Sequence, residues 1–252
     1  MKQIRRILSK KRRSDRLHKT EEGEMPNFLS ITKRFPRFTG REKYCNICGY
    51  RFAKFQPFGH PPREAKCPIC GSLERHRHLY IHLASIYPFL AGKCILHFAP
   101  EGVIKKILSG SAAQYYDADI DIEKATHQVD ITNIEFNDNK FDYVFCIHVL
   151  EHIPDDIKAM QELYRVLKPG GAAYLAVPWR KDFLEDPTVT DPEGRLRLYG
   201  HPDHVRIYNL EEFCKRLKSV GFNTDLISLP ENFPAPLQDA NLVDPIVIAR
   251  KL

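Results

Sequence analysis

The chain has 252 residues, of which 43% are hydrophobic, enough for one α/β domain and a small additional module. It contains no apolar run of about 18 residues, so no membrane-spanning helix is predicted. The N-terminus lacks the apolar stretch of a secretory signal peptide, and we therefore expect a cytoplasmic protein.

The net charge of +6 is concentrated in residues 1–20, which hold nine Lys and Arg against one Asp. Such an arm can attach to nucleic acid or an anionic membrane, but the remaining body is nearly neutral, unlike a surface built to bind RNA.

Four segments follow one another along the chain. Residues 1–40 are charged and show no periodicity, which is typical of a flexible or peripheral arm. Residues 41–72 contain two cysteine pairs, and residues 73–92 have apolar side chains at helical spacing, which predicts a linker helix. From residue 93 to residue 252 strand-like and helix-like stretches alternate, the pattern of a Rossmann-like, doubly wound α/β sheet.

The last segment contains most of the predicted elements. Strands are expected over 94–98, 114–118, 141–147 and 172–178, and helices over 103–110, 156–168 and 211–220. Two later strand candidates, 225–229 and 246–249, would complete a seven-stranded sheet.

Four of the seven cysteines form two C-x-x-C pairs, and the other three lie singly in apolar runs. The pairs are Cys45 with Cys48 and Cys67 with Cys70. Two intervening residues make a tight turn that directs both thiolates at one metal ion, and Gly49 and Gly71 follow the pairs where the chain must turn. The separation of 18 residues between the pairs favours a four-cysteine zinc ribbon over an iron–sulfur cluster. With four protein ligands the zinc would be structural.

Three histidines near the cysteines, His60, His76 and His78, are interpreted as surface or linker groups because four thiolates already complete a tetrahedral site. The run Arg75-His76-Arg77 follows the cysteine module directly. It is either a solvated helix start or a group that reaches an anionic or hydroxylated substrate.

The most informative stretch reads KFDYVFCIHVLEHIPDDIKAMQELYRVLKPGGAAYLAVP. It resembles the class I S-adenosylmethionine-dependent methyltransferases, in particular the broad type 11-like group that methylates small molecules. In that family FD opens the fourth strand, LEH begins the next helix, and LKPGG is the turn before the fifth strand. The resemblance covers residues 93–252 and implies a Rossmann-like fold with S-adenosylmethionine as the cofactor.

The first motif of that family, a glycine-rich turn after the first strand, is altered in this chain. The corresponding LHFAPEG contains one glycine, Gly102, and His97 stands where an acidic residue is usual. A turn at Ala99 can still be tight, and Glu101 is placed to receive the methionyl ammonium of the cofactor. A related subset of bacterial methyltransferases also has HFAPE at this point.

An acidic residue at the end of the second strand is implied to accept hydrogen bonds from both ribose hydroxyls of the cofactor. Asp119 is the first choice, and Asp117 and Asp121 are close rivals because the choice depends on strand register.

Three further positions match cofactor contacts of the family. Asp130 is expected to accept from the exocyclic amine of adenine while Ile131 packs on the ring. Ile147, at the end of the fourth strand, is expected to border the sulfonium, as is the following His148.

Methyl transfer to a hydroxyl needs a base that removes its proton. His148 is the first candidate because it follows a central strand, where sites of this fold gather. Glu151 and His152 begin the helix of the LEH match and are interpreted as structural.

The loop YGHPDHVRIY, residues 199–208, is expected to cover the acceptor and to supply a second candidate base, His204. An alternative is a second metal site made by His201, Asp203 and His204. The residues predicted to contact the acceptor are Trp179, which ends the fifth strand, His201, Asp203, Arg206, which suits a carboxylate or phosphate, and Tyr208.

The leading hypothesis is a methyltransferase acting on a hydroxyl or amine of a small molecule or saccharide, with the zinc module shaping the acceptor cleft. An RNA methyltransferase with a zinc-ribbon recognition module is the first alternative, favoured by the basic arm and opposed by the neutral body and the absence of an NPPY-like motif. A non-catalytic cofactor-fold protein that binds a partner is the second, favoured by the altered first motif. The sequence does not indicate the oligomeric state.

Overall fold

A computed structural model describes residues 40–227 and 245–252. Clustering of contacts divides these residues into two compact units, 40–88 and 89–227 with 245–252. The predicted basic arm, apart from residue 40, lies outside the described residues. Within the described ranges, none of the helices has the length and apolar character needed to cross a lipid bilayer.

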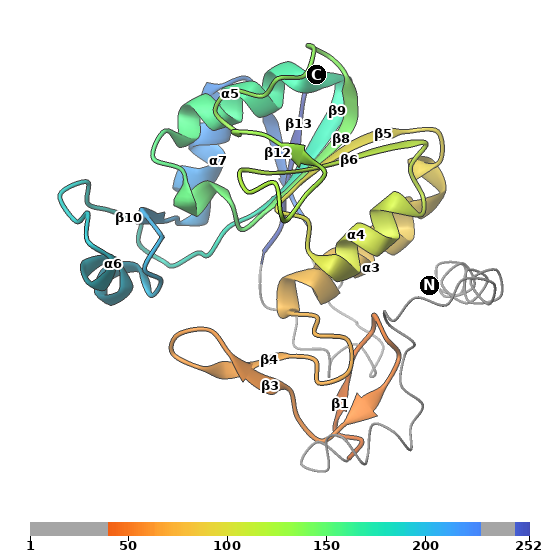
Figure 1. Cartoon of the computed structure of the whole chain (residues 1–252), viewed down its shortest axis with the longest axis vertical. Helices are drawn as coiled ribbons and strands as arrows, with labels where there is room; N and C mark the ends of the chain where they lie inside the picture. Colours follow the sequence, from red (N-terminus) through yellow and green to blue (C-terminus); the bar gives the residue numbers. More distant parts are fainter. Residues whose placement is uncertain (1–39, 228–244) are drawn as a thin grey trace. The chain divides into compact units, whose positions relative to one another are not determined.

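The first unit consists of two small hairpins and a helix (Figure 1). Strand β1 (Lys43–Tyr44) pairs with β2 (Arg51–Phe52), and β3 (Gln56–Phe58) pairs with β4 (Arg63–Lys66), both antiparallel. The following helix α3 (Glu74–Leu90) confirms the helix predicted from its apolar spacing. Strands this short cannot form a large core, which fits a module that depends on a metal.

The second unit is built on a seven-stranded sheet, as predicted. In spatial order the strands are β12 (Asn223–Leu226), β13 (Val247–Arg250), β9 (Leu167–Ala176), β8 (Phe141–Ile147), β5 (Cys94–Phe98), β6 (Gln114–Asp119) and β7 (His127–Gln128). Only β13 runs antiparallel to its neighbours. The chain starts at β5, proceeds outward on one side to β7, and returns to β8 on the other side. This reversal between β5 and β8 is the switch point at which open α/β sheets bind ligands.

Helices cover both faces of this sheet (Figure 1). Helices α5 (Asp156–Val166) and α7 (Leu210–Ser219) bury apolar side chains in one continuous core with the sheet, while α4 (Gly102–Ser109) lies on the opposite face. A peripheral segment contains α6 (Pro192–Tyr199) and the short pair β10 (Leu184–Glu185) and β11 (Arg206–Ile207).

The prediction that LEH begins the next helix was wrong. Leu150–His152 forms a separate 3-10 turn rather than the start of a helix, because Ile153 precedes Pro154 and takes an extended conformation. Helix α5 begins after this break, where the carboxylate of Asp155 accepts from Lys158 N at 3.0 Å. This break moves Glu151 and His152 out of α5 and into the loop at the carboxyl edge of the sheet.

Strand boundaries also differ from those expected. Strand β9 begins at Leu167, ahead of the LKPGG glycines, because Leu167 already pairs with Phe141. The third strand, β7, has only two residues, too few for any periodicity to show. The predicted strand 225–229 begins earlier, at Asn223, and its residues 228–229 lie outside the described part of the chain.

Candidate functional site

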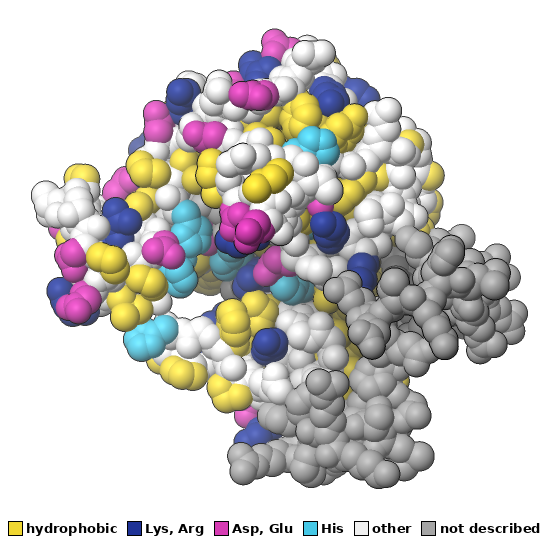
Figure 2. All heavy atoms as spheres, in the orientation of Figure 1, with side chains coloured by type: hydrophobic (Ala, Val, Ile, Leu, Met, Phe, Trp, Pro, Cys, Tyr) yellow, Lys and Arg dark blue, Asp and Glu magenta, His cyan; other side chains and the backbone are white. Residues whose placement is uncertain are grey.

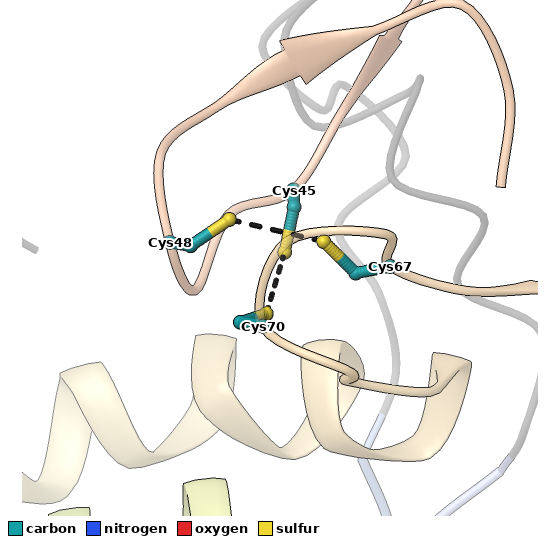
Figure 3. A group of neighbouring side chains, drawn as sticks. All are labelled: Cys45, Cys48, Cys67 and Cys70. Carbon is teal, nitrogen blue, oxygen red and sulfur yellow. Dashed lines mark hydrogen bonds between the residues drawn. The ribbon is translucent and has the colours of Figure 1, made fainter. Parts of the chain in front are cut away.

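The four paired cysteines converge on one point in the first unit (Figure 3). Their sulfur atoms all lie within 4.8 Å of one another, with 3.7 Å between Cys45 and Cys70 and 3.8 Å between Cys48 and Cys67. A tetrahedral zinc ion with bonds of about 2.3 Å would hold its sulfur ligands roughly 3.8 Å apart. Both the donor set and the spacing therefore fit zinc, although the cluster itself is what the structure establishes.

The backbone around the cysteines is shaped for this convergence. Gly49 N donates to Cys45 O at 2.8 Å and Gly71 N donates to Cys67 O at 3.0 Å. Both glycines have positive φ, 78° and 72°, which other residues adopt only with strain. The glycines predicted to turn the chain after each pair therefore do so.

Helix α3 is fixed to this cluster by charged and polar groups that sequence reasoning placed at the surface. The guanidinium of Arg77 is buried, donates to Ala65 O at 2.9 Å and Ser72 O at 2.7 Å, and lies 4.1 Å from the Phe55 ring centre. His76 and His78 are buried as well. Of the two alternatives, surface or linker groups, the surface one was wrong for these histidines, which are buried in the predicted linker helix; His60 is exposed as expected.

In the second unit, two non-glycine residues adopt left-handed backbone conformations at the carboxyl ends of the two strands that flank the switch point. Ala99, with φ of 45°, follows β5, and His148, with φ of 55°, follows β8. Each conformation costs free energy, and strain of this kind gathers at ligand sites. Hydrogen bonds hold both turns, from Ala99 N to Ala118 O at 2.9 Å and from His148 N to Ala176 O at 2.8 Å.

The structure distinguishes two of the three rival aspartates near the end of β6, Asp117 and Asp119. Asp117 is buried and bonded to Lys105 and Thr126; burial by itself would raise its pKa, but these bonds lower the pKa to about 2. Asp119 is half-buried at the last strand position, and one carboxylate oxygen accepts from Asp121 N at 2.9 Å. Asp117 is thus committed to the protein, whereas Asp119 retains acceptor capacity.

The remaining predicted cofactor residues surround the same edge. His97 is buried in β5, with Nδ1 2.9 Å from the Tyr115 hydroxyl. Glu101 precedes α4, and a Cβ atom at Gly102 would meet nothing within 4 Å, so open space lies beside the first turn of this helix. Ile147 is the buried last residue of β8.

The two residues predicted to contact adenine differ in their exposure to solvent. Asp130 is exposed and accepts from Thr132 N and Thr132 Oγ1, both at 2.8 Å, whereas Ile131 is buried in the apolar core. Sequence reasoning missed Ile120, which directly follows Asp119 and is 65% exposed. The signal that could have found it is a large apolar residue just beyond the end of a central strand.

His148 has a carboxylate partner. Its Nδ1 lies 3.2 Å from Glu151 Oε1, and the Glu151 side chain is fully buried. Burial would raise the pKa of Glu151, but the neighbouring His148 and His152 lower it below its usual value. A buried carboxylate that orients an imidazole is the arrangement found behind many histidine bases.

Three further imidazoles gather beside this pair. His152, His201 and His204 each offer a ring nitrogen within 4.8 Å of the others. The rings of His201 and His204 stack at 4.5 Å, and His152 meets His204 edge-on at 4.7 Å. Burial lowers the pKa of His204 to about 4. Asp203, the third member of the alternative metal set, is exposed and does not belong to this cluster, which contains His152 instead.

Two residues predicted to bind the acceptor hold the protein together instead. All five N–H donors of Arg206 bond within the protein, to Glu185 and to the backbone oxygens of Leu150, Ile153 and Pro154. Its side chain is 2% exposed, so the prediction that Arg206 binds the substrate was wrong.

Tyr208 is fully buried and donates to Asp156 Oδ2 at 2.5 Å, so it too is structural. Trp179 is 44% exposed after β9 and forms an isolated bridge with Tyr208. Of the predicted acceptor residues, Trp179, His201 and Asp203 therefore remain accessible.

We expect Arg206→Ala to lower the free energy of unfolding by about 3–5 kcal/mol, because it leaves Glu185 and three carbonyls without their buried partner. Urea denaturation followed by circular dichroism measures this change. Arg197→Ala is the matched control, since Arg197 forms an exposed pair with Glu193 at 3.8 Å and its loss should have no measurable effect. Equal stabilities of the two variants would contradict the structural role of Arg206.

Comparison with known proteins identifies this unit. Residues 104–175 match a family model described as a methyltransferase domain. The sterol 24-C-methyltransferase of Yarrowia lipolytica is 25% identical over 81% of this chain and 56% of its own length. Phosphoethanolamine N-methyltransferase 2 of Caenorhabditis elegans is 44% identical over 35% of this chain and 18% of its own length. The chain thus spans about half or less of the length of these curated relatives.

A solved structure shows the same fold. An S-adenosylmethionine-dependent methyltransferase from Mesorhizobium loti superposes with a TM-score of 0.50, covering 69% of this chain and 97% of that one at 13% identity, which shows a shared fold. The chain therefore contains a four-cysteine cluster followed in sequence by a Rossmann-like unit, within which residues 104–175 match a methyltransferase domain.

Proposed function

We propose that the chain transfers a methyl group from S-adenosylmethionine to a hydroxyl or amine of a small molecule or saccharide. The observation that carries the proposal is the pair of left-handed residues, Ala99 and His148, at the carboxyl ends of the two strands flanking the switch point. The relatives named above, which methylate a sterol and phosphoethanolamine, support a small-molecule acceptor.

Residues at this edge fit the cofactor. Asp119 has acceptor capacity for the ribose hydroxyls, and the open space at Gly102 leaves room for the methionyl end, with Glu101 beside it. The exposed side chain of Ile120 offers an apolar surface to the adenine ring, alongside the predicted acceptor Asp130.

The bound cofactor supplies an electrophilic methyl group, so the protein must align the acceptor and remove its proton. We assign proton removal to His148, whose Nδ1 faces Glu151 and whose Nε2 is then the atom that takes the proton. Glu151 is a positioning residue that fixes the ring orientation and stabilises its charged form. Trp179 and His201 are the accessible candidates for acceptor contact.

Zinc at the four cysteines completes the proposal. Four thiolates leave no open coordination position, so the ion would hold the first unit together and take no part in methyl transfer.

The proposal is tested by incubating the full chain with methyl-labelled S-adenosylmethionine and a panel of small-molecule hydroxyl, amine and saccharide acceptors, with bulk RNA as a separate arm. Label transfer to a small molecule or saccharide supports the proposal. Transfer to RNA alone would replace it with the RNA methyltransferase reading, and failure to bind the cofactor by calorimetry would leave a non-catalytic protein.

We expect Asp119→Ala to raise the Kd for S-adenosylmethionine about tenfold to hundredfold, because two hydrogen bonds to a carboxylate are lost. Isothermal titration calorimetry measures the change. Asp121→Ala is the control, since its carboxylate accepts from Glu123 N and pairs with Lys124 at the surface. Equal affinities of the two variants would remove Asp119 from the cofactor site.

A further inference from the structure

We propose that His152, His201 and His204 bind a divalent transition-metal ion in the second unit, separate from the four-cysteine cluster. The three imidazoles come from two segments about 50 positions apart, the turn after β8 and the loop after α6, yet their ligand nitrogens lie within 4.8 Å of one another. Figure 2 shows histidine side chains gathered at the surface of the drawn face near the α6 segment.

The hydrogen bonds of the three rings leave ring nitrogens available to a metal ion. Nδ1 of His152 lies 3.3 Å from Asp203 O and can donate its proton there, which leaves Nε2 with a free lone pair. Metal-binding histidines commonly donate their other N–H to a backbone carbonyl in this way. Nδ1 of His204 is buried and has no hydrogen-bond partner among the described residues. Nδ1 of His201 accepts only a long bond, 3.2 Å, from Asp203 N, which a metal ion would replace.

A buried carboxyl group beside the cluster is a second observation. Glu151 directly precedes His152, is fully buried, and within the described residues its Oε2 meets no hydrogen-bond donor. Leaving a buried carboxyl oxygen without a partner costs free energy, and a cation held by the three histidines would compensate that cost.

The donor set determines which metal is expected. Neutral imidazoles favour zinc, cobalt, nickel or copper over magnesium or calcium, which prefer oxygen ligands. Three protein ligands leave one coordination position open, the pattern of a metal that binds a small ligand rather than one that is structural. A role of the ion in holding the acceptor oxygen near His148 rests on the proposed function. Binding of the ion to the three histidines does not.

The test titrates cobalt into the full chain with its cysteine-bound metal in place, using calorimetry and absorption spectroscopy. We expect one bound cobalt per chain without the sulfur-to-metal charge-transfer absorption of thiolate ligands. His201→Ala and His204→Ala should each weaken binding at least about tenfold, since loss of outer-shell partners alone has that effect. His60→Ala, which removes an exposed histidine of the first unit, should leave the affinity for cobalt unchanged.

Unfolding would not explain a loss of cobalt binding in the His201→Ala variant. His201 lies partly at the surface, and its replacement removes no buried contact of the core. Absence of bound cobalt, binding with thiolate absorption only, or unchanged affinity in the His201→Ala variant would each overturn the proposal. None of these outcomes depends on methyl transfer, so the metal site and the proposed function can fail separately.

Discussion

His148→Asn is expected to lower the rate of methyl transfer to a hydroxyl acceptor by about 10²–10⁴-fold, the usual contribution of a general base. Asparagine suits this position because it tolerates the left-handed backbone that His148 adopts, so the substitution removes the imidazole without adding strain. Single-turnover measurement with an acceptor identified by the labelling screen separates this loss from changes in product release.

Two companion variants sharpen this prediction. Glu151→Gln keeps the shape of the buried side chain but removes its charge, and should move the rise of rate with pH that a histidine base gives to lower pH. His60→Ala should behave as the unchanged protein. The affinity for S-adenosylmethionine should change little in all three variants. A full rate in His148→Asn would exclude His148 as the base.

Cys45→Ser is expected to remove one zinc ion per chain and to unfold the first unit. Structural zinc in small modules contributes about 10–16 kcal/mol of apparent binding free energy, more than hairpins this short can replace. Cys45 is fully buried among the other three thiols, so its replacement removes one of the four ligands from the centre of the cluster. Metal analysis and hydrogen exchange measure the two effects: amides of β1–β4 should lose protection while those of β5, β8 and β9 keep it.

Cys214→Ala is the matched control, because this cysteine belongs to α7 of the second unit and is not a member of the cluster. It should retain zinc and protection in the first unit. Retention of zinc by Cys45→Ser with normal protection of β1–β4 would contradict a structural metal at the four cysteines.

Short-range patterns in the sequence predicted much of the fold correctly. The cysteine spacing is local, so the two knuckles and the convergence of the four thiols follow from a few residues around each pair. The order of strand-like stretches likewise predicted the sheet, and β6 ends at Asp119 as expected. In each case the physical cause acts over a few neighbouring positions.

The features that were missed depend on contacts between distant segments or on backbone strain. Arg206 looks like a surface arginine in the sequence, and only the approach of the 3-10 turn and β10 surrounds its guanidinium with acceptors. His152 and His201 are 49 positions apart, so no spacing rule joins them. The left-handed turns at Ala99 and His148 carry no glycine and leave no trace in composition.

The most direct test of the account is a crystal structure of the full chain grown with S-adenosylhomocysteine. We predict its density at the carboxyl ends of β5, β6 and β8, with the ribose on Asp119 and the sulfur facing His148. Density at another place, or a ribose held by a residue other than Asp119, would contradict the cofactor site described above.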